Sequence, residues 1–197
     1  MTFDLTNYAS PATVIGAFVV FLLIVALVAL LVRRHRKETA ELRARFGPEY
    51  DLAVLSEGSR SRAEATLRER LRRVQVFKIR DLSVSQRHRY LAEWDTLQTQ
   101  FIDYPTATVT EAEWLVNSVL QARGFPAALF EQRAEDISVD YALLVAPFRS
   151  AHKIALRAGR NEATTEEMRT AMIHFRSLFD ELLGVSTAME TRALVEG

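Results

Sequence analysis

The sequence predicts an all-α protein, with one N-terminal transmembrane helix followed by a helical-bundle-like soluble domain. Two observations support this prediction. Residues 5–32 carry no charged side chain, and residues 12–32 are almost continuously apolar. After that run, apolar residues recur at spacings of three and four, as on one face of a helix, and no alternating strand pattern of useful length occurs.

The apolar run has the length of a membrane-spanning helix. At about 1.5 Å per residue, residues 12–32 would extend roughly 31 Å, and the hydrocarbon core of a bilayer is about 30 Å thick. Ser10 is the expected N-cap and Pro11 the expected first helical residue. We therefore expect a short extracytoplasmic segment over residues 1–10 and a transmembrane helix over residues 11–32.

Small side chains recur four residues apart within this helix. Ala12 and Gly16 form one such pair, and Thr13 and Ala17 form another. This spacing lets two transmembrane helices approach closely, so it would allow a parallel homodimer.

The charges that flank the apolar run predict its orientation. Residues 33–37 read RRHRK, whereas residues 1–9 contain one acidic residue and no lysine or arginine. Positive charge concentrates on the cytoplasmic side of membrane proteins. A cleaved signal peptide would need a basic start, a shorter apolar run and a cleavage site of small residues. The expectation is a single-pass protein of the inner or plasma membrane, N-terminus outside and C-terminal domain cytoplasmic.

The overall neutrality of the chain conceals two segments of opposite charge. Residues 33–80 hold 14 basic and 7 acidic residues, a net charge of +7, whereas residues 81–197 hold 11 and 17, a net charge of −6. The basic segment is predicted to contact anionic lipid, where each nearby cation contributes about 1 kcal/mol, or a protein partner of unknown identity. The candidate contact residues are Arg33, Arg34, Arg36, Lys37, Arg68, Arg72 and Arg73.

The basic segment has two other interpretations. A solvated helix with internal ion pairs is one, because Glu64 with Arg68 and Glu69 with Arg73 have the favourable i,i+4 order. Nucleic-acid binding is not expected, since the whole chain is neutral and no aromatic residues interleave the arginines.

Helix boundaries in the basic segment follow from glycine, proline and capping residues. The membrane helix should continue to Phe46, where Gly47 and Pro48 end it, and Pro48 can open a second helix. Ser61 with Glu64 predicts a capping box for a third helix. Its narrow, coiled-coil-like apolar stripe comprises Ala63, Leu67, Leu71 and Val74.

Residues 81–184 predict a compact domain of about five helices. Capping boxes are expected at Ser83 with Gln86 and at Thr164 with Glu167. Helices should end near residues 103–105, 124, 137, 159 and 184, leaving a loose tail over residues 185–197. The expected apolar stripes are Val84, Leu91, Trp94, Leu97 and Phe101; Val109, Ala112, Leu115, Val116, Val119 and Leu120; Tyr141, Leu144, Val145, Phe148, His152 and Ala155, with Pro147 interrupting or kinking the helix; and Met168, Ala171, Met172, Phe175, Phe179 and Leu182.

The residues that usually carry enzymatic chemistry do not form a motif here. The chain has no cysteine, no H-E-x-x-H, no G-x-S-x-G, no Walker loop and no G-x-G-x-x-G. We therefore expect no cofactor and name no catalytic residue. One alternative stays open: His152 and His174, with Asp136 or Asp140, could form a metal site.

Several short strings resemble an uncharacterised family of bacterial membrane-anchored proteins, some of which are labelled as secreted. They are LRARFGPEYD (42–51), RGFP (123–126), FEQR (130–133) and SVD (138–140), together with Trp94, Gln98, Phe101, Asp103 and Pro105. Because that family has no established activity, the resemblance implies no functional residue. Histidine and proline usually follow Ser-Val-Asp in the family, whereas this chain has Tyr141 and Ala142.

Taken together, these features predict a membrane-anchored binding or scaffolding module at the inner face of the membrane. The alternative is a small membrane-bound enzyme or metal-binding helical bundle.

Overall fold

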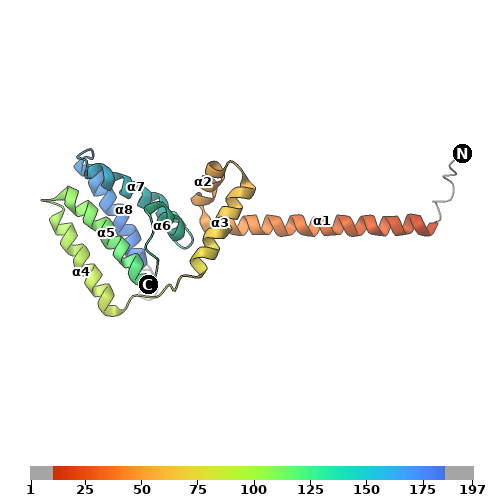
Figure 1. Cartoon of the computed structure of the whole chain (residues 1–197), viewed down its shortest axis with the longest axis horizontal. Coiled ribbons are helices and arrows are strands. Elements are labelled where there is room, and N and C mark those ends of the chain that lie inside the picture. The colour runs from red at the N-terminus through yellow and green to blue at the C-terminus, as the bar shows by residue number, and fades with distance from the viewer. Residues whose placement is uncertain (1–10, 185–197) are drawn as a thin grey trace, which may run out of the picture. The chain divides into compact units, whose positions relative to one another are not determined.

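The computed structural model describes residues 11–184, and every regular element within them is a helix (Figure 1). The chain divides into two compact units between Ala44 and Arg45. The predicted all-α fold with a long apolar N-terminal helix is therefore confirmed. The expected N-cap Ser10 and the expected tail over residues 185–197 lie outside the described residues.

Helix α1 (Pro11–Phe46) continues without a break from the apolar run into the basic residues. Among the helices of residues 11–184, it is the one long and apolar enough to cross a membrane. Its side chains from Ile15 to Val32 are all exposed to the surroundings, so no other part of the described chain covers them. The helix ends at Gly47, whose φ of 47° suits glycine, and Pro48 opens the next helix, as predicted.

Helices α2 (Pro48–Glu57) and α3 (Arg60–Gln75) pack against each other. The predicted capping box of Ser61 and Glu64 is wrong. The N-cap of α3 is Ser59, which makes no side-chain cap, and Glu64 is buried with 1% of its surface exposed. Its carboxylate instead accepts hydrogen bonds from the Tyr50 hydroxyl at 3.0 Å and from Arg68 at 3.2 Å. The Glu64 carboxylate is therefore used in a contact between α2 and α3 and is not available to accept the hydrogen bond of a capping box.

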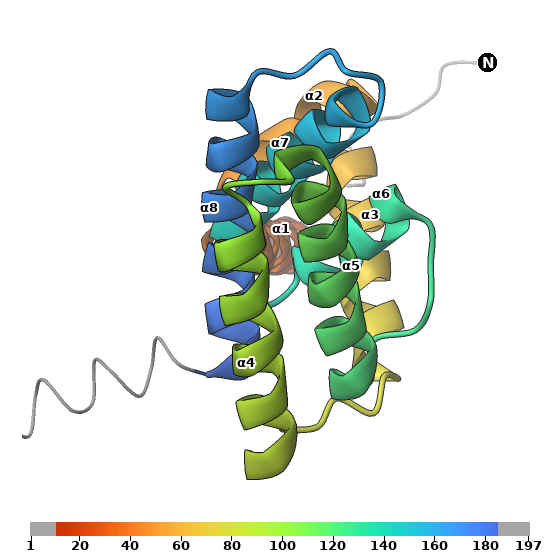
Figure 2. The ribbon, with the colours of Figure 1, turned by 90° about the vertical axis from the view of Figure 1, so that its left-hand side faces the viewer.

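Five further helices follow: α4 (Val84–Gln100), α5 (Pro105–Arg123), α6 (Phe130–Ile137), α7 (Ala142–Ala158) and α8 (Thr165–Leu183). Helix α8 packs against α5 and α7, and α4 packs against α5 and lies beside α8 (Figure 2). The predicted stripe of α8 is buried throughout, together with Leu178 and Leu183. Helix α8 is therefore the centre of the hydrophobic core.

The two predicted capping boxes of these later helices are confirmed. At the start of α4, Ser83 Oγ accepts from the Gln86 backbone N–H, and the Gln86 side chain accepts from the Ser83 N–H. Thr164 and Glu167 form the same arrangement before α8. Val84 was expected in the buried stripe of α4, but it is 70% exposed because it lies in the first turn, at the edge of the core.

Glycine is required where α5 ends. Gly124 has a φ of 102°, and a Cβ at this position would lie 2.3 Å from the carbonyl oxygen of Lys78. The same junction is held by a hydrogen bond from the Arg80 N–H to the Arg123 carbonyl oxygen and by edge-on packing of Phe77 against Phe125. The α3–α4 connection is thereby fixed to the end of α5.

Helix α7 is a single helix from Ala142 to Ala158 that contains Pro147. Proline lacks the N–H that would bond to the carbonyl of Leu143. Leu143 is 75% exposed, so water can reach the freed carbonyl. Pro147 therefore does not interrupt the helix.

Candidate functional site

The basic cluster at residues 33–37 lies on α1, directly after the apolar side chains. Arg34 pairs with Glu38 at 3.2 Å and Lys37 with Glu41 at 3.9 Å, yet both basic side chains remain 81% exposed. Exposed i,i+4 pairs of this kind contribute little and are easily replaced by other anions. These side chains are thus accessible to a negatively charged surface.

The arginines of α3 that were grouped with this cluster have different surroundings. Arg73 donates from Nε to Asp136 Oδ1 at 2.7 Å and from Nη2 to Glu135 Oε2 at 3.0 Å, and Arg70 donates to Glu135 Oε1 at 3.0 Å. The predicted Glu69–Arg73 pair is wrong, because Glu69 pairs with Arg72. We call Arg70, Arg73, Glu135 and Asp136 the α3–α6 clamp. It joins two helices more than sixty residues apart in sequence.

Protonation within the α3–α6 clamp reflects burial and pairing. Asp136 is 2% exposed, and burial raises the pKa of its carboxyl, although the hydrogen bond from Arg73 opposes that change. Burial opposes ionisation of Arg73 too, but the hydrogen bonds to Asp136 and Glu135 raise the pKa of its guanidinium. Arg73 stays charged and holds Asp136 in place, which is a role within the fold.

Arg68 and Arg72 remain closer to the predicted surface position. Arg68 pairs with Glu64 at 3.2 Å, as predicted, and its side chain is 39% exposed. Arg72 is 70% exposed and pairs with Glu69 at 2.7 Å. Of the three α3 candidates, Arg72 is the most available to a lipid or a partner.

The histidines proposed for a metal site do not meet a set of ligands. His152 is 20% exposed, its Nδ1 lies 2.7 Å from Glu113 Oε1, and its ring stacks on Phe130 at 3.6 Å between centroids. Nδ1 of His174 is buried and makes no hydrogen bond with any residue that the structure describes. The two carboxylates proposed with them are engaged elsewhere, Asp136 with Arg73 and Asp140 with Arg45. Within residues 11–184, no group of three or more candidate ligands is arranged to hold a metal ion.

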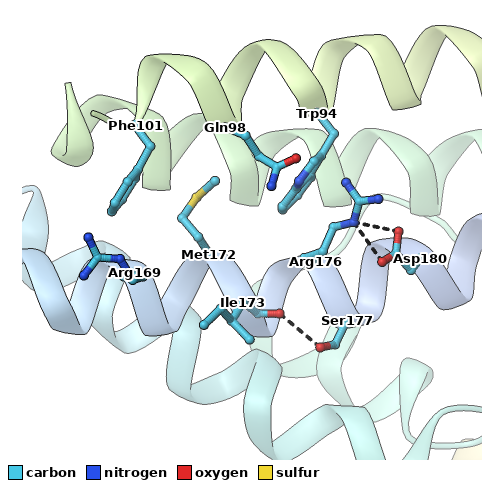
Figure 3. A pocket seen from close by; sticks show the side chains of 9 residues that line it. All are labelled: Trp94, Gln98, Phe101, Arg169, Met172, Ile173, Arg176, Ser177 and Asp180. Carbon is cyan, nitrogen blue, oxygen red and sulfur yellow. Dashed lines mark hydrogen bonds and ion pairs between the residues drawn. The ribbon is translucent and has the colours of Figure 1, made fainter. Parts of the chain in front are cut away.

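A pocket of about 310 Å³ opens between α4 and α8 (Figure 3). Its apolar walls come from the two predicted stripes, and its polar groups come from the neighbouring turns of the same helices. The lining residues are Trp94, Gln98, Phe101, Arg169, Met172, Ile173, Arg176, Ser177 and Asp180.

Trp94 forms the inner wall of this pocket. It is 1% exposed, and its ring packs against Phe179 at 4.8 Å between centroids. The guanidinium carbon of Arg176 lies 5.4 Å from the centre of the Trp94 ring, in cation–π contact. The indole Nε1–H is buried and has no hydrogen-bond partner in the described chain. Because buried donors are nearly always satisfied in proteins, this N–H is a marked exception.

Other donors surround the same pocket. The Nε of Arg176 bonds to Asp180 at 2.8 Å, whereas its terminal nitrogens make no hydrogen bond within residues 11–184. Arg169 pairs with Glu166 and is 56% exposed. Ser177 donates to the Ile173 carbonyl oxygen at 3.0 Å. The α4–α8 pocket is therefore apolar in its walls, and its polar groups are several N–H donors and the buried Asp180 Oδ1, which forms the ion pair with Arg176 but accepts no hydrogen bond within residues 11–184.

From their spacing in the sequence, Trp94, Phe101 and Met172 are predicted only as members of core stripes. The pocket forms between α4 and α8, so its position depends on how the two helices pack and not on the spacing within either one. One signal was present in the sequence: Arg169 and Arg176 lie seven residues apart, about two turns of α8, so they share one face on the border of its buried stripe.

Comparison with models of known protein families, with curated proteins and with solved structures finds no match to this chain.

Proposed function

We propose that this protein is a single-pass, membrane-anchored binding module whose helical domain faces the cytoplasm. One observation carries the proposal: α1 presents an uncovered apolar surface of membrane length that is followed directly by exposed basic side chains. An apolar helix left uncovered in water would be strongly unfavourable, whereas in a bilayer the same surface needs no protein partner. The resemblance to a family of membrane-anchored proteins agrees with this role.

The basic cluster at residues 33–37 supplies the orientation and a contact with anionic lipid. Lysine and arginine next to a membrane helix are retained on the cytoplasmic side. Each cation near an anionic leaflet contributes about 1 kcal/mol, so several of them hold the chain close to the inner surface. The helical domain then meets its partners in a layer next to the membrane rather than throughout the cell volume.

The native chain lacks cysteine, which allows single cysteines to report topology. We would express Ser85→Cys and, separately, Thr6→Cys in full-length chains and treat intact cells with a membrane-impermeant maleimide. We expect Thr6→Cys to react in intact cells and Ser85→Cys to react only after permeabilisation. Alkaline carbonate should leave the full chain in the membrane fraction. Labelling of Ser85→Cys in intact cells, or release by carbonate, would contradict the proposal.

The role of the basic cluster is tested in the same assay. Replacing Arg33, Arg34, Arg36 and Lys37 by glutamine should place part of the population in the inverted orientation, so that Ser85→Cys becomes labelled in intact cells. The matched control replaces four exposed basic residues farther along the chain, namely Arg60, Arg62, Arg89 and Lys153. Equal effects of the two sets would show that position next to the membrane does not matter.

A further inference from the structure

We propose that the α4–α8 pocket binds a small amphipathic carboxylate. This proposal rests on the proposed function, because it names a ligand for the membrane-anchored binding domain. Its location within one compact unit, between α4 and α8, makes it independent of how that unit is placed at the membrane.

Donors around the pocket are left without an acceptor among the described residues. Within residues 11–184, the buried Trp94 N–H is unpaired, and the terminal nitrogens of Arg176 make no hydrogen bond. Gln98 lies one helical turn after Trp94, lines the pocket and makes no side-chain hydrogen bond within residues 11–184, so its amide can donate to a ligand (Figure 3). A ligand oxygen that enters at this end would satisfy the buried Trp94 donor and could also bond to the Arg176 guanidinium, whose side chain is 30% exposed.

The charges around the pocket disfavour a ligand with more than one negative charge. Asp180 pairs with Arg176, and Glu166 pairs with Arg169, so these four charges sum to zero. A carboxylate carries one charge over two oxygens and matches the planar donors of a guanidinium. A phosphate dianion would meet the Asp180 carboxylate without enough positive charge to balance it.

The walls select an apolar body of limited size. Phe101, Met172 and Ile173 line the pocket away from the Trp94 end, in the direction of Arg169 (Figure 3). A volume of about 310 Å³ is at the lower end of the range of about 300–1,000 Å³ that holds small organic ligands. The occupant is therefore a short-chain or single-ring carboxylic acid, with its carboxylate at Arg176 and its body along Met172.

Hexanoate is the probe, because it is soluble and has this shape. The full-length chain in detergent micelles would carry Trp114→Phe, so that Trp94 is the one remaining tryptophan. We expect a saturable change in Trp94 fluorescence with a dissociation constant on the order of 1 mM or below. Hexanamide, which lacks the charge, should bind at least about tenfold more weakly, and sodium chloride at equal ionic strength should give no change.

The variant that tests the carboxylate contact is Arg176→Met with Asp180→Asn, which removes both members of the ion pair and leaves no unpaired charge. It should weaken hexanoate binding at least about tenfold. The matched control is Arg89→Met with Glu93→Gln, since Arg89 also pairs four residues on and lies over an aromatic ring, that of Tyr90. This control should bind hexanoate as the parent does.

Gln98→Leu provides a second variant that leaves the ion pair intact, and it should bind hexanoate more weakly. Helical circular dichroism of each variant shows that the fold is retained. The proposal is overturned if hexanoate gives no saturable change, if hexanamide binds as tightly, or if the Arg176 and Asp180 double variant binds as the parent does. The topology assays are unaffected by any of these results, so the anchored orientation and the carboxylate site can fail separately.

Discussion

Replacement of Arg73 by methionine should destabilise the helical domain by removing the centre of the α3–α6 clamp. Methionine keeps much of the length and apolar stem of arginine but cannot donate to Asp136 or Glu135. Asp136, at 2% exposure, would then keep a charge without its nearest partner. The change therefore tests whether Arg73 serves the fold or, as the sequence suggested, a lipid surface.

The expected magnitude follows from burial. Breaking a buried ion pair by removing one partner costs about 3–5 kcal/mol. Arg73 is itself 29% exposed, and Arg70 remains close to Glu135, so water and a second guanidinium recover part of the loss. We expect the free energy of unfolding to fall by about 2–4 kcal/mol.

Denaturant unfolding of the full chain in detergent, followed by circular dichroism, measures this change. Arg72→Met is the matched control, because Arg72 neighbours Arg73 on α3 but is 70% exposed, and its loss should cost about 0–1 kcal/mol. Asp136→Asn and its combination with Arg73→Met complete a double-mutant cycle, which should show a coupling of at least about 1 kcal/mol.

The reasoning would be refuted if Arg73→Met cost no more than Arg72→Met. A coupling near zero with Asp136→Asn would refute it as well, since it would show that the two side chains act independently. Either result would return Arg73 to the group of lipid-facing candidates.

Three other substitutions test separate features. Gly124→Ala should destabilise the domain by at least about 1–3 kcal/mol in denaturant unfolding, because φ is 102° and the new Cβ would meet the Lys78 carbonyl oxygen; a loss below 0.5 kcal/mol would contradict this. Hydrogen bonding from Arg157, together with the Thr164 cap, lowers the pKa of Glu167 from 4.5 to about 2. Its contribution to stability is therefore present above pH 4.5 and is lost as the pH falls towards 2, so acid titration of Glu167→Gln should lack that part of the pH dependence. Phe175→Ala should cost about 3–5 kcal/mol in thermal or denaturant unfolding, since Phe175 is fully buried on α8.

Local features of this fold were predictable because they depend on neighbours in sequence. The capping boxes at Ser83 and Thr164 need two residues three positions apart, and both form. Ser61 and Glu64 show the same pattern, yet Glu64 is bound by Tyr50 from another helix. A capping pattern thus predicts a helix start unless a tertiary partner competes for its acceptor.

Features that depend on packing were not predictable from spacing. The partner of Arg73 lies 63 residues away, and Arg149 pairs with the buried Glu49 across 100 residues. A domain boundary is predicted near residue 80 from the change in charge, whereas α3 belongs to the same compact unit as α6 and is joined to it by the clamp. The α4–α8 pocket was also not predictable, because the spacing of Trp94 is that of a core residue and the pocket depends on how α4 and α8 pack.

The central position of α8 has a consequence for biosynthesis. Of the described helices, α1 emerges from the ribosome first. The hydrophobic core of the domain cannot be completed until α8, which ends at Leu183, has been synthesised. At about 5–20 residues per second, the residues between Phe46 and Leu183 take roughly 7–27 s to synthesise. In the membrane-anchored protein proposed above, the apolar helix can enter the insertion machinery during that interval, while the rest of the nascent chain is still unfolded, so targeting would precede folding.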